Sequence, residues 1–298
     1  MAEFAIQFLN SAVSVFWKEG LKVSGNHIVR ILSVHKRQEV TMDFQSQGRP
    51  LSDEGMDQVC STLNVSRAEV WTVLSVETSG FGFLQDRRPQ ILFERHIFNR
   101  LTKGRHDSGN ADISNARAGG YVGGSGEYTR LEKAMSLDRE AALKSASWGI
   151  GQVMGFNYAV AGFDSIDAMV SGMVKDENTQ LLAMANFING NNLASALQRQ
   201  DWASLARGYN GPEYEKNKYD TRLAAAHAQY KLHLPDLTLR NAQTALLYLG
   251  IDPVYIDGIY GSLTRSALMR FQEQYGLPET GELDQETESR LLAEAFPA

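Results

Sequence analysis

One helix that is apolar on nearly every side constrains the fold of this chain more than any other segment. Residues 66–69 read S-R-A-E, which is a capping box and predicts the start of a helix. The turns that follow carry the apolar residues Val70, Trp71, Val73, Leu74 and Val76. A helix without a polar face is stable only inside a protein core. We therefore expect this helix to be buried in the centre of a domain.

The same helix ends on a carboxylate. Glu77 lies in its last turn, directly before T-S-G. There its charge faces the negative end of the helix dipole, which is unfavourable. That position, together with burial against aromatic neighbours, would raise the pKa of a carboxyl group above its usual ~4.3. A carboxylic acid that keeps its proton near neutral pH can act as a general acid. The alternative is a solvated helix end without a catalytic role.

Composition excludes several classes of protein. The 298 residues are 43% hydrophobic, which suffices for one to three domains, and the net charge of −6 argues against a nucleic-acid partner. The single cysteine, Cys60, excludes an internal disulfide and a cysteine-based metal cluster, and the six histidines show no ligand spacing. No metal or other cofactor is expected. No run reaches the ~18 apolar residues of a membrane span, so stable membrane insertion is not expected either.

The first 50 residues are interpreted as an N-terminal extension. Residues 5–17 are apolar, but no basic residues precede them and no small-residue cleavage site follows, so we predict no signal peptide. The stretch Q-E-V-T-M at 38–42 can be encoded by a ribosome-binding sequence placed just before an ATG codon. One hypothesis is that translation naturally begins at Met42. The alternative is an ordinary N-terminal helix and hairpin.

Helical periodicity dominates the rest of the chain. We expect helices at 51–63, 66–77, 129–146, 164–174, 176–189, 192–206, 213–231, 239–249, 265–275 and from about 285 to 294. Residues 90–98 fit either a short strand or a helix start.

Two segments interrupt this pattern. Residues 104–128 are polar and glycine-rich and predict a long loop, which in a compact domain is more often functional than idle. Phosphate binding is a weak interpretation of this loop, because no G-K-[ST] follows its glycines. Residues 233–238 read as a linker, which predicts one domain over 51–232 and a second over 239–298.

The C-terminal segment contains a characteristic turn, D-G-I-Y-G-S-L-T at 257–264, between A-Q-T-A-L-L-Y-L-G at 242–250 and G-E-L-D at 281–284. Residues 239–292 thereby resemble the three-helix peptidoglycan-binding module of cell-wall hydrolases. The resemblance implies bacterial peptidoglycan as the partner, bound through the turn residues Asp257, Gly258, Tyr260 and Thr264. The same residues also suit a tight turn and a helix N-terminus, which is the structural alternative.

The middle of the chain carries four further motifs. They are V-E-T-S-G-F-G-F at 76–83, R-P-Q-I-L-F-E-R-H-I-F at 88–98, S-A-S-W-G-I-G-Q-V-M-G-F-N at 145–157 and A-R-G-Y-N-G-P at 206–212. Residues 52–228 resemble a phage-type N-acetylmuramidase domain, and more weakly lytic transglycosylases and goose-type lysozymes. The implied fold is mainly α, with a lysozyme-like catalytic domain that holds a small β element, followed by the three-helix domain.

The resemblance also implies roles for individual residues. Glu77 takes the place of the catalytic acid. The residues that would line the sugar cleft are Ser147, Gln152, Tyr209 and Asn210. For the last two, turn formation before Gly211 is an alternative explanation.

Glycosidases usually need a second carboxylate to direct water or to form a covalent bond. Glu94 is the best candidate, because it lies in an otherwise apolar run where an unpaired charge would be costly. The alternative is a structural ion pair with Arg88, Arg95 or another base. Asp86, Asp107 and Asp112 are reserve candidates. Some lysozyme-like enzymes work with one dominant glutamate, so a second need not exist.

The expected protein is a monomeric endolysin that cleaves the β-1,4 bond between N-acetylmuramic acid and N-acetylglucosamine. It would be made in the host cytoplasm and reach the wall in the periplasm after holin-type release. One alternative is a lytic transglycosylase that leaves 1,6-anhydro ends. Another is a phage structural protein that binds murein without cutting it. An amidase or peptidase is disfavoured, because neither a metal set nor a nucleophile–His–acid arrangement is visible.

Overall fold

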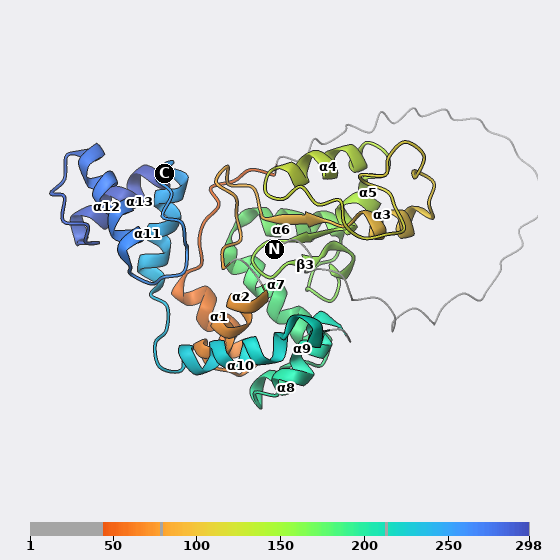
Figure 1. Cartoon of the computed structure of the whole chain (residues 1–298), viewed down its shortest axis with the longest axis horizontal. Helices are drawn as coiled ribbons and strands as arrows, with labels where there is room; N and C mark the ends of the chain where they lie inside the picture. The colour runs from red at the N-terminus through yellow and green to blue at the C-terminus, as the bar shows by residue number, and fades with distance from the viewer. Residues whose placement is uncertain (1–43, 78–79, 212–213, 298) are drawn as a thin grey trace, which may run out of the picture.

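The computed structural model describes residues 44–77, 80–211 and 214–297. They form two hydrophobic cores, a large one and a small C-terminal one, and hence two domains (Figure 1). The structure is mainly helical, as the sequence predicts. The large domain contains α1 (Asp53–Leu63), α2 (Arg67–Glu77), α3 (Arg95–Thr102), α4 (Gly126–Met135), α5 (Arg139–Lys144), α6 (Ile166–Lys175), α7 (Glu177–Gly190), α8 (Ala194–Gln198), α9 (Trp202–Asn210) and α10 (Tyr219–Tyr230), with the 3-10 helices η1 (Gly155–Asn157) and η2 (Tyr214–Asn217).

The folded part of the large domain begins before the predicted boundary at residue 51. Phe44 is buried, and its ring centroid lies 5.2 Å from that of Tyr128 and 5.9 Å from that of Trp148. The proposed start at Met42 lies outside the described residues. A chain that began there would still contain Phe44.

Helix α2 forms as its sequence predicts. The Ser66 N–H donates to Glu69 Oε2 at 3.0 Å, and the Ala68 N–H donates to Ser66 Oγ at 3.2 Å, so the capping box is present. The apolar side chains of α2 are buried between α1 and α10. This packing fixes the position at which α2 ends.

A small antiparallel sheet lies beside the helices, with strand order β1–β2–β3. The strands are β1 (Ile91–Phe93), β2 (Ala146–Trp148) and β3 (Val153–Met154). Ile91 pairs with Trp148 and Phe93 with Ala146. The sequence of residues 90–98 fits either a short strand or a helix start. The structure has both, first the strand β1 and then the start of α3.

The predicted helix 213–231 is divided between the 3-10 helix η2 and α10, and two other predicted helices are divided at an aspartate. The segment 129–146 is divided into α4, α5 and the first residue of β2, and 192–206 is divided between α8 and α9. In each case an aspartate starts a new helix: Asp138 accepts from the Ala141 N–H, and Asp201 accepts from the Ser204 N–H, both at 3.1 Å. At both places the aspartate side chain, and not a backbone carbonyl oxygen, accepts from an N–H group in the first turn of the new helix. This caps the new helix and separates it from the preceding one.

The glycine-rich segment is irregular up to the start of α4, as expected, and it is held by polar contacts. Arg95 donates to three of its carbonyl oxygens, those of Ala111, Arg117 and Ala118. The buried carboxylate of Glu127 accepts from two successive N–H groups, at positions 122 and 123. Glu127 also pairs with Arg130 at 2.6 Å. The loop is therefore fixed against α3 and α4.

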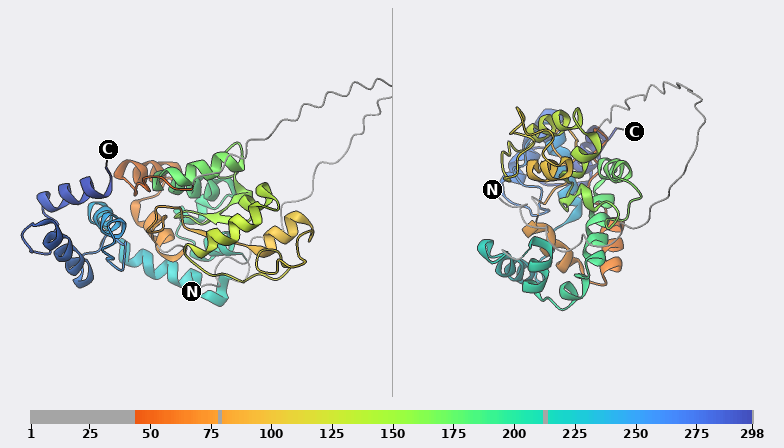
Figure 2. Two further views of the ribbon diagram at one scale, coloured as in Figure 1. Left: turned by 90° about the horizontal axis from the view of Figure 1, so that it is seen from above. Right: turned by 90° about the vertical axis from the view of Figure 1, so that its right-hand side faces the viewer.

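The C-terminal domain consists of α11 (Leu237–Tyr248), α12 (Ser262–Tyr275) and α13 (Gln285–Ala295). These helices form the left end of the molecule in Figure 1 and in the left view of Figure 2. The predicted linker is shorter than expected, because Asp236 caps α11 by accepting from the Leu239 N–H at 3.1 Å. Leu237 belongs to the hydrophobic core of the large domain, so α11 starts inside that domain.

Within the parts of the chain that the structure describes, no helix combines the length and the apolar character that crossing a membrane requires.

The pairing of α2 with α10 should make stability depend on pH. Burial alone would raise the pKa of Glu69, but hydrogen bonds from Ser66 and His227 outweigh it and lower this pKa below 4.5. A depressed carboxylate pKa stabilises the fold above the unfolded-state pKa, and this contribution is lost as the pH falls through the folded-state value. We expect the melting temperature to fall below about pH 4.5, and to fall less steeply in Glu69→Gln. The exposed Glu54→Gln is the control, and an unchanged slope in Glu69→Gln would contradict the assignment.

Candidate functional site

Helix α2 ends at Glu77, and the last turn before it is contacted from α10. The Arg222 guanidinium donates to the Val76 carbonyl oxygen at 3.4 Å. A positive charge at this end of a helix complements the dipole and satisfies one of its terminal carbonyl groups. The end of α2 is thus stabilised both by its own hydrogen bonds and by a side chain of α10.

The turn between β2 and β3 contains Gln152, one of the predicted cleft residues. Gln152 has a positive φ of 47°, which is uncommon for a residue other than glycine. Its amide oxygen accepts from Ser147 Oγ at 2.7 Å, and its amide nitrogen donates to the carbonyl oxygens of Gly149 and Gln90 at 2.9 and 3.3 Å. These bonds hold the turn against β1. Ser147 and Trp148 are buried, so neither presents its side chain to solvent.

Tyr209 connects the end of α9 to this turn. Its hydroxyl donates to the Gly151 carbonyl oxygen at 2.9 Å, and its ring packs edge-on against Phe187. Asn210 is the last residue of α9. The structure therefore brings the Gln152 and Tyr209 segments together.

The segment that resumes at Gly80 completes the arrangement. The Gln90 side chain donates to the Phe81 carbonyl oxygen at 2.8 Å, and the Gln90 N–H donates to the Gly82 carbonyl oxygen at 2.8 Å. Because Gln152 donates to the carbonyl of Gln90, hydrogen bonds run from the β2–β3 turn to the residues that follow α2. Gln90 was not predicted as a site residue. Only the tertiary pairing of these segments reveals it.

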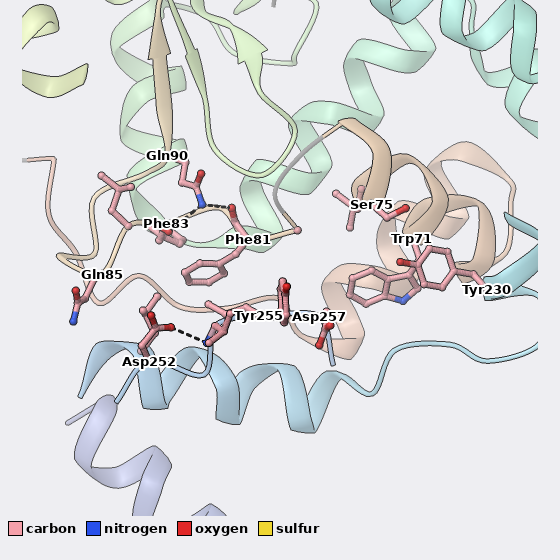
Figure 3. A pocket seen from close by; sticks show the side chains of 16 residues that line it. Trp71, Ser75, Phe81, Phe83, Gln85, Gln90, Tyr230, Asp252, Tyr255 and Asp257 are labelled. Carbon is pink, nitrogen blue, oxygen red and sulfur yellow. Dashed lines mark hydrogen bonds between the residues drawn. The ribbon is translucent and has the colours of Figure 1, made fainter. Parts of the chain in front are cut away.

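A pocket of about 470 Å³ lies beside this segment, between the two domains. Trp71 and Ser75 of α2 line it on one side, with Phe81 from the following segment. Tyr255 and Asp257 line it from the C-terminal domain (Figure 3). The walls are mainly apolar, both aliphatic and aromatic, with a few polar groups among them, which is typical of ligand-binding pockets.

Glu94 lies at the start of α3 and is completely buried. Both of its carboxylate oxygens accept from the Tyr121 hydroxyl, at 3.0 and 2.9 Å. His96 Nδ1 lies 3.0 Å from Glu94 Oε2 without hydrogen-bond alignment. Burial and then the charge of Glu94 raise the pKa of the Tyr121 hydroxyl. The bases expected from sequence, Arg88 and Arg95, have other partners.

The three reserve carboxylates are each engaged at the surface. Asp86 pairs with Arg88 at 2.7 Å, and Asp112 pairs with Lys133 at 2.8 Å. Asp107 accepts hydrogen bonds from Ser114 and Asn99, which lower its pKa. These contacts give each of the three carboxylates a structural role. Across the described residues, no group of three or more His, Cys, Asp or Glu side chains could hold a metal ion.

The predicted wall-binding turn is organised by one buried glutamine. The Gln243 amide oxygen accepts from the N–H groups of Asp257 and Gly258, and its amide nitrogen donates to Asp257 Oδ1 and Thr264 Oγ1. Gly258 has a φ of 68°, and a Cβ there would lie 2.5 Å from the Asp236 carbonyl oxygen, so this close approach requires glycine. The turn chemistry therefore explains Asp257, Gly258 and Thr264 without a ligand.

Tyr260 differs from the other three turn residues, because its side chain is 47% exposed. Further large apolar side chains are exposed within the same stretch, namely Val254, Tyr255, Ile259 and Leu263. The sequence does not single them out as binding candidates, because exposed apolar residues in a turn and at a helix start give no periodic signal. These exposed apolar side chains, all within residues 254–263, are candidates for a binding surface.

Comparison with known proteins agrees with this geometry. The family model of N-acetylmuramidase matches residues 66–231, and that of a peptidoglycan-binding domain matches residues 237–291. The crystal structure of the Burkholderia AP3 phage endolysin is similar to this chain with a TM-score of 0.58 and 36% sequence identity. The similarity covers 62% of this chain and 72% of that chain. No curated protein matches the chain.

The contact between Glu94 and Tyr121 should couple α3 to the glycine-rich segment. A hydrogen bond to a buried charged group contributes about 1.5–3 kcal/mol. We expect the losses of unfolding free energy in Glu94→Ala and Tyr121→Phe to be non-additive by more than about 1 kcal/mol in the double variant. Chemical denaturation of the four proteins measures this coupling. Additive losses would mean that the contact stabilises nothing.

Proposed function

Because the chain belongs to the N-acetylmuramidase family, we propose that it is an endolysin that cleaves the glycan strands of bacterial peptidoglycan. The bond is the β-1,4 link between N-acetylmuramic acid and N-acetylglucosamine. The observation that carries the proposal is the position of Glu77, at the end of a buried helix and within the family match. Similarity to a phage endolysin supports the biological role.

In the proposed reaction Glu77 donates its proton to the glycosidic oxygen. A sugar alkoxide is a poor leaving group, so protonation in the transition state lowers the barrier. A general acid must keep its proton until this step, and we propose that the position of Glu77 at a helix C-terminus favours the protonated form. Water then attacks the anomeric carbon.

In this proposal most of the predicted cleft residues do not contact the sugar themselves. They fix the main chain that forms the sugar-binding wall. The amide of Gln152 and the hydroxyl of Tyr209 have partners in the β2–β3 turn, so their role is to shape the sugar-binding wall. Ser147 supports Gln152 from the buried side. Asn210, at the end of α9, is proposed as a direct contact to the sugar.

A second catalytic carboxylate stays a prediction. Glu94 was the candidate for directing water, and its complete burial with Tyr121 favours a structural role instead. The surface acids have their own partners. We therefore propose a reaction in which Glu77 is the dominant catalytic group, acting first as acid and then as base toward water.

The C-terminal domain is proposed to hold the enzyme on the wall through Tyr260 and the exposed apolar residues near it. Bacterial peptidoglycan is then both substrate and anchor for a monomeric enzyme. The wall is reached in the periplasm, from the cytoplasm, after holin-type release.

Replacement of Glu77 by Gln should abolish most activity. Glutamine keeps the size and polarity of the side chain but has no acidic proton, and loss of general acid catalysis typically costs 10²–10⁴-fold in rate. Turbidity loss of purified sacculi measures the rate, and co-sedimentation with sacculi measures binding, which should be unchanged. The exposed Glu54→Gln serves as the matched control. A folded Glu77→Gln protein that retains full activity would contradict the assignment of Glu77 as the catalytic acid.

Mass spectrometry of the soluble fragments should find reducing muramic acid ends that contain a full water. Ends lighter by one water would instead identify a lytic transglycosylase, in which the sugar's own 6-hydroxyl attacks. Binding to sacculi without any fragments would support a non-catalytic murein-binding protein. Each of the three results therefore supports a different function: hydrolase, lytic transglycosylase or binding protein.

A further inference from the structure

The first helix of the C-terminal domain carries an arginine that is completely buried against the large domain. Arg240 Nη1 lies 2.7 Å from Glu177 Oε2, and Arg240 Nη2 donates to Glu177 Oε1 at 2.9 Å. Neither side chain has any exposed surface. The two residues come from α11 and from the first turn of α7, so this bidentate ion pair joins the two domains.

Glu177 has two further partners, both in the large domain. Its Oε2 accepts from the Leu51 N–H at 2.8 Å, and its Oε1 accepts from the Gly82 N–H at 2.7 Å. The large domain thus supplies two neutral donors to this carboxylate. The positive charge comes from the C-terminal domain.

Arg240 also contacts the chain just after α2. Its Nη2 donates to the Gly80 carbonyl oxygen at 2.6 Å, three residues beyond Glu77. Two residues later, Gly82 donates to Glu177, and a Cβ at Gly82 would lie 1.9 Å from Gln180 Oε1. Residues 80–82 therefore fit closely between Arg240, Glu177 and the Gln180 side chain.

Aromatic rings enclose the same guanidinium. Its carbon lies 5.8 Å from the ring centroid of Trp71 and 5.7 Å from that of Phe81. Both rings line the pocket between the domains (Figure 3). The Tyr248 hydroxyl, on the same helix as Arg240, donates to the Gly48 carbonyl oxygen at 2.7 Å. The interface thus includes the aromatic rings around Arg240 and a second contact further along α11, from Tyr248 to Gly48.

We propose that Arg240 is a positioning residue for Glu77, so that the wall-binding domain forms part of the catalytic unit. The inference rests on the proposed function, because it takes Glu77 as the acid. Arg240 fixes residues 80–82 directly and through Glu177, and Glu77 lies only three residues before Gly80 in the chain. A small displacement of a catalytic group lowers the rate steeply.

Replacing Arg240 alone combines two effects, because it leaves the Glu177 carboxylate buried without a counter-charge. The test therefore uses Arg240→Met, Arg240→Lys and the double variant Arg240→Met/Glu177→Met. The double variant removes the unpaired charge, but the Gly80 carbonyl oxygen still lacks its donor, and the N–H groups of Leu51 and Gly82 lose their acceptor. The exposed Arg290→Met, on α13, is the matched control.

Each full-length variant is assayed for melting temperature, for binding to sacculi, and for kcat and KM on soluble peptide-free glycan strands. For Arg240→Met we expect a melting temperature lower by about 10 °C. At a temperature where the protein is folded, its kcat should fall at least about tenfold, while KM changes less than about twofold. Sacculus binding should be unchanged, because the exposed residues at 254–263 are not altered.

The double variant separates positioning from stability. We expect its melting temperature to recover at least half of the loss while kcat stays low. Arg240→Lys should recover part of kcat, because lysine supplies the charge without the planar pair of donors that Arg240 presents. Recovery of kcat in step with melting temperature in the double variant would overturn the proposal, and so would a wild-type kcat in any variant that lacks Arg240.

Failure of the proposed function would look different. If the unaltered protein released no glycan fragments, Glu77 would not be a glycosidase acid, whatever the variants did. A cleaving wild-type protein with fully active Arg240 variants would leave the enzymatic function intact and reject only the positioning role.

Discussion

The carboxylate of Glu177 joins three parts of the chain that lie far apart in sequence. It accepts hydrogen bonds from Leu51 at the start of α1, from Gly82 after α2, and from Arg240 in α11. A buried carboxylate needs all of these donors, because removal from water costs more than any one of them returns. The relative positions of α1, α7, the segment after α2 and the C-terminal domain are fixed together at this one group.

The segments that carry the candidate site residues are joined largely by hydrogen bonds between side chains and backbone. Tyr209, Gln152 and Gln90 each donate to a carbonyl oxygen of a neighbouring segment, and these bonds lead from α9 through the sheet to residue 81. Such an arrangement limits the movement of the main chain around the end of α2. It is suited to a reaction in which one acid must be held accurately, because the rate depends on the position of the acid as much as on its pKa.

How far the sequence predicts this structure depends on the range of the interactions. Helix α2 and its capping box are local, and the sequence predicts both correctly. Asp138 and Asp201 are also local caps, but the helical periodicity continues across them, and only the N-cap preference of aspartate marks the breaks. The partners Tyr121 of Glu94 and Arg240 of Glu177 could not be predicted. They are separated by 27 and 63 residues, and an arginine in a helix reads as a surface residue until the tertiary structure is known.

The interface limits how this enzyme can be recombined with other wall-binding domains. A replacement domain fused after residue 236 would need an arginine one turn into its first helix and a tyrosine two turns further on, in the places of Arg240 and Tyr248. A fusion without them would leave Glu177 without its cation and Gly48 without its donor. Engineers of chimeric lysins who wish to change the bacterial target would therefore do better to redesign the proposed wall-binding residues at 254–263 and to keep α11 as it is.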